Sequence, residues 1–326
     1  MSLTINHQTD DISNLTGATT FNGVAVGGDN SPKWYGGRSV LAGGIINFST
    51  AVNTIQYFAN STNTNASDFG DLTSVNYAQG GASNGTRALF AGGDGTGYPY
   101  AVNIDYVTIA TTGNASDFGD LNTNSSLGRK DCAGAGNGTY AFFTGSSSST
   151  FKQIDYVTVA TTGNAQDWGD LSARTYKNWS AANADRLLVG YIVTDTDAIE
   201  YVSSTTPGNT SDFGTLITPR QNSSAVSDTT RAVWGGGVQL SNNAQLNSLS
   251  YVTIATTGNA TDFGDLTVVR DEVSTSSSAT RGFWCGGSTP TKVNSIDVVT
   301  IQTTGNATDF GDLLAATSYV AGTAGD

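Results

Sequence analysis

The chain consists of short runs of alternating apolar and polar residues, separated by glycine and asparagine. One run recurs at Ile104–Ile109, Ile154–Val159, Leu249–Ile254 and Ile296–Ile301, with partial copies at Ile55–Phe58 and Ile199–Val202. β-Branched and aromatic residues dominate each copy and turn formers bound it, which is typical of a β-strand. The pattern predicts one such strand in each unit of a repeat.

A second apolar run begins with a basic or aromatic residue and ends in glycine. Its copies are Arg38–Gly44, Arg87–Gly93, Arg231–Gly237 and Arg281–Gly287, with weaker copies at Tyr140–Gly145 and Arg186–Gly190. This run also predicts a strand. We interpret the glycines as positions near a central axis, where only a residue without Cβ lets backbones approach closely.

A third word, DFGDL or a close variant, gives the repeat its period. It lies at Asp68–Leu72, Asp117–Leu121, Asp167–Leu171, Asp212–Leu216, Asp262–Leu266 and Asp309–Leu313. The first Asp residues are 49, 50, 45, 50 and 47 positions apart. We predict a loop here, in which Phe118 and Leu121 anchor the chain and Gly119 permits a bend. Asn114, Asp117 and Asp120 would accept hydrogen bonds from nearby backbone N–H groups; a calcium site in each unit is the alternative.

A helix-free unit of 45 to 50 residues with three or four strands matches a propeller blade better than a solenoid coil. Over residues 34–313 the sequence resembles kelch-type β-propellers, whose second strand also ends in Gly-Gly after an apolar run. The predicted fold is therefore an all-β, six-bladed, kelch-like β-propeller at residues 31–326, preceded by an attachment segment at residues 1–30.

The last repeat stops early, which bears on how the ring closes. Residues 313–326 lack the Arg-led strand that should follow them. We predict that they pair beside the first such strand, Arg38–Gly44, and so complete the first blade. Thr20–Val26 could supply the same strand locally, which leaves seven blades or an open ring as alternatives.

Composition and charge exclude several classes of function. The net charge is −13 with 14 Lys and Arg that do not cluster along the chain, so direct binding to nucleic acid is not expected. No secretory signal and no apolar window of membrane-spanning length is present, so neither export nor membrane insertion is expected. Cys132 and Cys285 lack CxxC or His companions, and Cys285 fits a small core position.

The single histidine, His7, lies before the repeats. Catalytic triads, His-ligated zinc and copper sites all need histidines inside the fold, so we predict no enzyme activity, no metal and no cofactor. A glycosidase that uses a pair of carboxylates remains an alternative, since the chain is rich in Asp.

Aromatic residues fall into two groups. Leu41, Phe90, Trp234 and Trp284 share one repeat position, which predicts a place in the core between blades. Trp34, Tyr98, Tyr100 and Trp179 lie outside the repeated words, among Asn and Gly. We predict that these four form a sugar-binding or protein-binding surface.

The opening segment, residues 3–14, and the units of the form GNATDFGDL resemble virion structural proteins of tailed bacteriophages. The resemblance implies a non-enzymatic virion part such as a fibre, a collar or a tail or head appendage, assembled in the host cytoplasm. It also implies other virion proteins as partners through residues 1–30, a host-surface glycan as ligand and a homo-oligomer in the particle. A soluble carbohydrate-binding or protein-binding propeller is the alternative.

Overall fold

The computed structural model describes residues 36–325, except residues 48, 96–99, 123–127, 147–150, 174, 176, 194 and 195. It also gives the backbone of four short N-terminal strands: β1 (Thr4–Asn6), β2 (Asp11–Ser13), β3 (Thr19–Phe21) and β4 (Val24–Val26). β1 pairs with β2, and β3 pairs with β4. Apart from these strands, the attachment segment predicted at residues 1–30 lies outside the described residues, as does His7.

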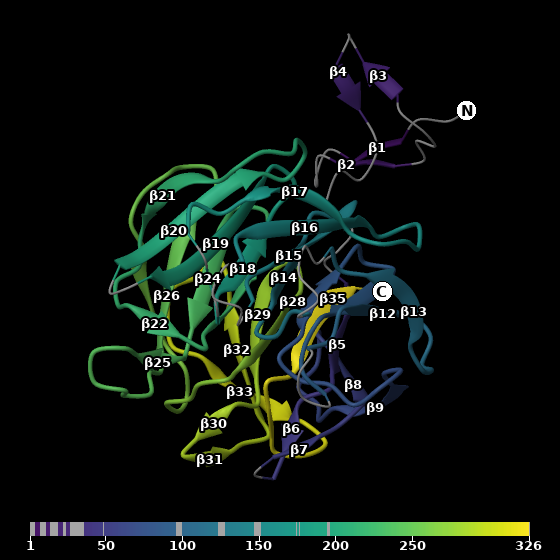
Figure 1. Cartoon of the computed structure of the whole chain (residues 1–326). Coiled ribbons are helices and arrows are strands. Elements are labelled where there is room, and N and C mark those ends of the chain that lie inside the picture. Colours follow the sequence, from purple (N-terminus) through teal and green to yellow (C-terminus); the bar gives the residue numbers. More distant parts are fainter. Residues whose placement is uncertain are drawn as a thin grey trace.

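The prediction of an all-β fold is confirmed. The described residues contain no helix, and hence none that could cross a membrane. Six four-stranded antiparallel sheets make up the body (Figure 1), and we number them 1 to 6 along the chain. Each repeat supplies four strands, an arrangement consistent with a β-propeller-like fold.

Each sheet has a first, second, third and fourth strand in spatial order, and these correspond from sheet 1 to sheet 6. The first strands are β35 (Ala321–Gly325), β10 (Gly80–Ser83), β14 (Ala133–Gly136), β18 (Trp179–Ala182), β23 (Ser224–Ser227) and β28 (Ser274–Ser277). The second strands are β5 (Arg38–Ala42), β11 (Arg87–Ala91), β15 (Tyr140–Thr144), β19 (Arg186–Val193), β24 (Arg231–Gly235) and β29 (Arg281–Cys285). The third strands are β8 (Thr54–Ala59), β12 (Asn103–Thr108), β16 (Gln153–Thr158), β20 (Thr196–Ser203), β26 (Ser248–Thr253) and β32 (Ser295–Thr300). The fourth strands are β9 (Ser67–Asp71), β13 (Ser116–Asp120), β17 (Gln166–Asp170), β21 (Ser211–Thr215), β27 (Thr261–Asp265) and β33 (Thr308–Asp312).

Seven two-residue strands lie in the connections. They are β6 (Ile45–Ile46), β7 (Thr50–Ala51), β22 (Arg220–Gln221), β25 (Val238–Gln239), β30 (Ser288–Thr289), β31 (Thr291–Lys292) and β34 (Thr317–Ser318).

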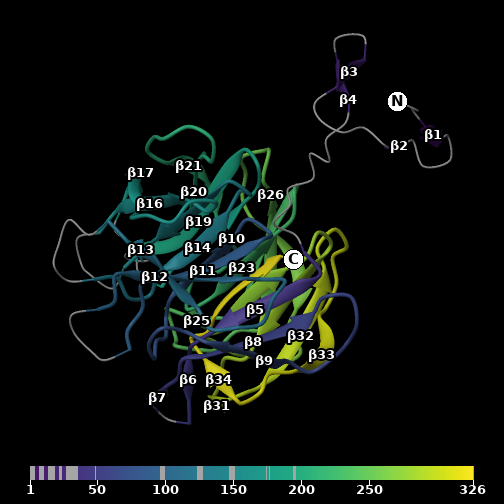
Figure 2. The same cartoon turned by 90° about the vertical axis from the view of Figure 1, so that its right-hand side faces the viewer.

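The C-terminal strand completes sheet 1. β35 pairs antiparallel with β5, from Ala321 opposite Ala42 to Gly325 opposite Arg38, and the two lie side by side in Figure 2. Sheet 1 therefore combines the last strand of the chain with strands of the first repeat. The first strands of successive sheets contact one another in the order β10, β14, β18, β23, β28, β35, and β35 also contacts β10.

The hydrophobic core lies between neighbouring sheets. Leu41, Phe90, Trp234 and Trp284, predicted to be core residues, are all 0% exposed. Between sheets 6 and 1, the ring of Phe58 lies 5.2 Å from that of Phe283 in an edge-to-face arrangement. Alternation along each strand thus places one set of side chains against each neighbouring sheet.

The DFGDL word forms a strand, so the loop predicted there is wrong. Its residues make the outer edge strand of each sheet, as in β13, where Phe118 is the extra residue of a bulge opposite β12. An edge strand tolerates Asp and Gly because one side of it faces solvent, and a bulge and charged residues also discourage pairing with other chains. The predicted anchoring is confirmed, because Phe118 and Leu121 are buried.

The Asn residue before each outer strand bonds to a neighbouring sheet and not to its own turn. Asn114 Oδ1 in sheet 2 accepts a hydrogen bond from Asp71 N in sheet 1 at 3.1 Å. The same bond recurs between the following sheets, with Asn164, Asn209, Asn259 and Asn306 as acceptors. Asn65 of sheet 1 accepts the equivalent bond from Asp312 N of sheet 6 at 3.0 Å.

The glycine pair after the second strand permits the predicted close approach of backbones, but not at the predicted place. Gly43 and Gly44 adopt φ values of 67° and 109° in the turn that leaves β5, where a Cβ on Gly43 would lie 2.3 Å from the carbonyl oxygen of Asn76, and neither residue lines the space between the first strands. Close approach of backbones near the axis occurs instead at glycines of the first strands. A Cβ on Gly81 would lie 2.5 Å from the carbonyl oxygen of Gly322.

Both thiols are buried, which makes them slow to react in the folded protein. Cys132 is 8% exposed and Cys285 is 0% exposed, which confirms the core position predicted for Cys285. Burial raises the pKa of the Cys132 thiol to about 11 and also raises the pKa of Cys285. At pH 8 we expect neither thiol to react with Ellman's reagent until the protein unfolds, since the thiolate is the reactive form. Immediate reaction of one thiol in the native protein would contradict this.

Candidate functional site

Two sets of connections meet on one face of the molecule, which we call the entrance face. One set joins the fourth strand of a sheet to the first strand of the next, and the other joins the second strand to the third. Backbone hydrogen bonds link the two sets, such as Gly93 N to Arg129 O at 2.6 Å. A channel of about 160 Å³ runs between the first strands and is lined by residues 78–83, 131–136, 177–182, 222–227, 272–277 and 319–324.

Six structurally equivalent residues surround the channel where it meets the entrance face, and we call them the entrance ring. They are Ala78, Asp131, Lys177, Asn222, Glu272 and Tyr319. All six adopt left-handed backbone conformations, with φ between 54° and 58°. Backbone hydrogen bonds connect neighbouring positions, including Tyr319 N to Glu272 O at 3.0 Å and Ala78 N to Tyr319 O at 3.0 Å.

The ring combines acidic, basic, amide and phenolic groups. Burial raises the pKa of Asp131, an effect that Lys130 and Lys177 oppose and that Asp94 and Glu272 reinforce. Burial also raises the pKa of Tyr319, and the nearby, hydrogen-bonded carboxylate of Glu272 raises it further. The phenol of Tyr319 therefore stays a hydrogen-bond donor, while Asp131 and Glu272 supply acceptors and Lys177 a further donor.

A second polar cluster lies beside the ring, between sheets 2 and 3. Lys130 Nζ is 3.1 Å from Asp94 Oδ2 and 3.3 Å from the hydroxyl of Tyr77. It also lies 5.0 Å from the ring centre of Tyr77 and 5.8 Å from that of Tyr100. Burial lowers the pKa of Lys130, but the bonds to Tyr77 and Asp94 outweigh it and leave a raised pKa. The rings of Tyr77 and Tyr100 thus already contact a lysine of the chain itself.

Of the four predicted binding residues, the structure describes Tyr100 and Trp179. Trp34 and Tyr98 lie outside the described residues. Tyr100 is half-buried on the entrance face beside Lys130. Trp179 is 2% exposed in β18, and its ring stacks on Trp234 of sheet 5 with centroids 4.7 Å apart. Trp179 is therefore a core residue between two sheets.

The entrance ring is not among the residues predicted from the sequence, although the repeat carries a signal for it. Five ring residues come six positions after the Leu of the DFGDL word, as Tyr319 follows Leu313. Asp131 follows Leu121 by ten positions, because that connection is longer. The ring is a position in the repeat that is occupied by a different residue in every copy.

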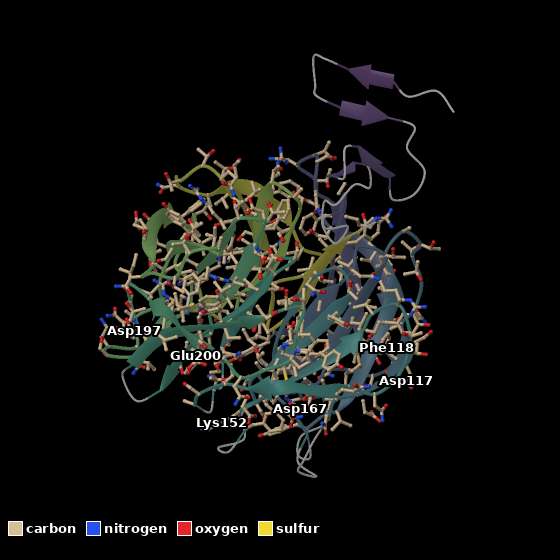
Figure 3. The ribbon with its side chains drawn as sticks, turned by 90° about the horizontal axis from the view of Figure 1, so that it is seen from above. Asp117, Phe118, Lys152, Asp167, Asp197 and Glu200 are labelled. Atoms are coloured by element: carbon tan, nitrogen blue, oxygen red, sulfur yellow. The ribbon has the colours of Figure 1, made fainter. Side chains whose placement is uncertain are left out.

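The outer strands carry eleven Asp residues, which we call the acidic girdle. They are Asp68, Asp71, Asp117, Asp120, Asp167, Asp170, Asp212, Asp262, Asp265, Asp309 and Asp312. Figure 3 shows Asp117 and Asp167 toward the outer margin of neighbouring sheets, and both are exposed. Among the described residues, no three His, Cys, Asp or Glu side chains are grouped as a metal site would need. Asn114 is one of the three residues of the calcium alternative, and its side-chain oxygen accepts a hydrogen bond from Asp71 N.

The chain was also compared with known proteins. No protein-family model matches the sequence, and no curated protein matches it.

Proposed function

We propose that the chain is a closed, six-bladed, kelch-like β-propeller that serves as a non-enzymatic structural part of a bacteriophage virion. In this proposal the entrance ring binds a ligand, and residues 1–30 attach the propeller to other virion proteins. The ligand is a glycan of the host surface. Assembly takes place in the host cytoplasm, and several copies are present in the particle.

Contacts between sheets 6 and 1 support a closed ring. The bonds from Asp312 N to Asn65 and from Ala66 N to Asp312 O, 3.0 and 2.7 Å long, repeat between these sheets the bonds that join the others. Arg281 Nη1 of sheet 6 also donates to Asn60 O of sheet 1 at 3.1 Å. The same hydrogen bonds thus occur between every pair of neighbouring sheets. Each sheet therefore has a neighbour on both faces, as a closed ring of six blades requires.

The observation that carries the binding role is the backbone of the entrance ring. The chain has 40 glycines, and glycine occupies many of its positive-φ positions. A left-handed conformation costs other residues about 1 kcal/mol or more each, and strain of this kind concentrates at functional sites. None of the six ring residues is a glycine, so we infer that their side chains are retained for what they bind.

The residue types of the ring suit a ligand rich in hydroxyl groups. Asp131 and Glu272 accept hydrogen bonds, Lys177 donates, Asn222 does both, and Tyr319 adds an aromatic face. A glycan presents donors and acceptors in the same mixture. The virion role rests on the resemblance of residues 3–14 and the GNATDFGDL units to phage structural proteins. A soluble glycan-binding propeller is the second candidate, and the ring supports it equally.

Replacing Lys177 by Gly should separate binding from stability. We expect Lys177→Gly to abolish binding on a glycan array, while the free energy of unfolding stays equal or rises by about 1 kcal/mol as backbone strain is relieved. Asn243→Gly is the matched control, because Asn243 also has a positive φ, 56°, but lies outside the ring. The control should bind normally. Unchanged binding by both Lys177→Gly and Glu272→Gly would show that the ring is not the site.

Particle composition tests the virion role separately. The full chain should be found in purified phage particles in several copies, and a chain that starts at residue 31 should fold but fail to join them. Glycan binding without particle association would favour the soluble propeller. Hydrolysis of a bound glycoside that is lost in Asp131→Asn would contradict the non-enzymatic role.

A further inference from the structure

The face opposite the entrance face, which we call the exit face, is built mainly of hairpins. Each hairpin joins the third strand of a sheet to the fourth. The hairpins lie at residues 60–66, 109–115, 159–165, 204–210, 254–260 and 301–307. Figure 2 shows β6, β7 and β34, which belong to the entrance face, at the lower end of the body. The hairpins lie at the other ends of the strands.

The chain enters the body from the exit face. β5 begins there at Arg38, and the two residues before it are held by Asn60, which follows β8. Asn60 N donates a hydrogen bond to Gly37 O at 2.7 Å, and Asn60 Nδ2 donates one to Gly36 O at 2.8 Å. The attachment segment proposed at residues 1–30 is therefore joined to the propeller at the exit face.

The connection between that segment and the body is too short to reach the entrance face. Residue 30 comes six residues before Gly36, so the two lie at most about 22 Å apart. A path to the entrance face leads outward past the third and fourth strands, about 10 Å, and then along a strand of five or six residues, about 20 Å. This path is longer than the connection. A partner that holds residues 1–30 therefore meets the propeller first at the exit face.

The exit face also differs from the entrance ring in its chemistry. The six hairpins contain no Asp, Glu, Lys or Arg, and the sequence TTGNA recurs in four of them. The nearest basic groups are half-buried and bonded to the hairpins, as when Arg38 Nη1 donates to Ile109 O at 2.9 Å. Repeated hydroxyl and amide groups suit a broad, hydrogen-bonded contact with another protein. The entrance ring, with a different residue in every copy, does not repeat in this way.

We propose that the propeller is mounted on the particle by its exit face, with the hairpins against the virion protein that holds residues 1–30. This orientation rests on the virion role proposed above. The entrance ring then points away from the particle and stays open to a glycan of the host surface. Attachment and ligand binding thus use opposite faces of the same propeller.

Cysteine labelling of purified particles tests the orientation. Because Cys132 and Cys285 are buried, an added exposed cysteine is the thiol that reacts with a PEG-maleimide. Thr112→Cys and Thr257→Cys place it on exit-face hairpins of sheets 2 and 5, and Ala316→Cys is the control on the entrance face; all three positions are exposed. In particles, we expect both exit-face cysteines to react at least about tenfold more slowly than in the free chain, because a protein contact excludes the reagent. Ala316→Cys should react at its free rate.

The free variants provide the reference. They should melt like the unmodified chain and react at similar rates, while the unmodified chain stays unlabelled. Equal labelling of both faces in particles that contain the chain would overturn the orientation, as would protection of Ala316→Cys alone, and either result leaves the virion role in place. A chain that is absent from purified particles would overturn both proposals, and this is seen before any labelling.

Discussion

Removing residues 317–326 is expected to convert a stable protein into one that aggregates. The deletion takes away β34 and β35, and with them the ladder to β5 and the buried side chains of Val320, Ala321 and Ala324. At about 1.5 to 3 kcal/mol for a buried aliphatic side chain and less for Ala, the loss is on the order of 5 kcal/mol. In a protein of this size that lowers the melting temperature by roughly 10 °C.

The edge of β5 would also become free to pair with another chain. Differential scanning calorimetry and light scattering measure both effects. A chain that lacks residues 1–30 is the control, and it should melt like the full chain. If the C-terminal deletion leaves the melting curve unchanged and the protein monomeric, the ring is not closed by β35.

Replacing Arg270 by Met should destabilise the protein by about 3 to 5 kcal/mol, because it leaves a buried carboxylate without its partner. Arg270 Nη2 lies 2.5 Å from Asp297 Oδ2, and both side chains are fully buried. Asp297 also accepts hydrogen bonds from the backbone N and the hydroxyl of Thr267. Urea denaturation measures the change. Lys292→Met, which removes a half-buried charge nearby, should cost less than about 1 kcal/mol.

The double replacement Arg270→Met with Asp297→Val should lose less than the single one, since no charge is then stranded. A single variant that is as stable as the double one would contradict this expectation.

Sheet 5 contains the same arrangement without the carboxylate. Ser250 occupies the position of Asp297 there, and burial lowers the pKa of the nearby Arg220 to about 10. Carbonyl oxygens such as Ser248 O, at 2.7 Å, satisfy Arg220 instead.

The repeat makes the strands predictable because their signals are local. Each alternating run, such as Ile104–Ile109, overlaps a third strand, and each Arg-led run overlaps a second strand. The DFGDL word predicts a loop because Asp, Gly and Asn favour turns in isolation, whereas at the solvent side of a sheet they form a bulged edge strand. The bonds made by Asn114 are not predictable either, since their partners lie in another repeat.

The aromatic residues show the same division between local and distant information. Trp234 and Trp284 are predictable as core residues because they share a position in the repeat. Trp179 lies outside the repeated words, and its place against Trp234 follows only from the packing of sheet 4 on sheet 5. The entrance ring has no sequence motif, because its members are defined by facing one channel and not by a shared residue type.

The all-β class, the unit of the repeat, the second and third strands, and the buried aromatic position are all predictable from local sequence pattern. These follow from alternation and turn formers within a few residues. Packing of the sheets against one another determines which strand is outermost, which glycines approach one another near the axis, and which six residues surround the channel. Those features depend on the juxtaposition of segments some 50 residues apart, as between Asn114 and Asp71 or Glu272 and Tyr319, and local pattern carries no information about such distances.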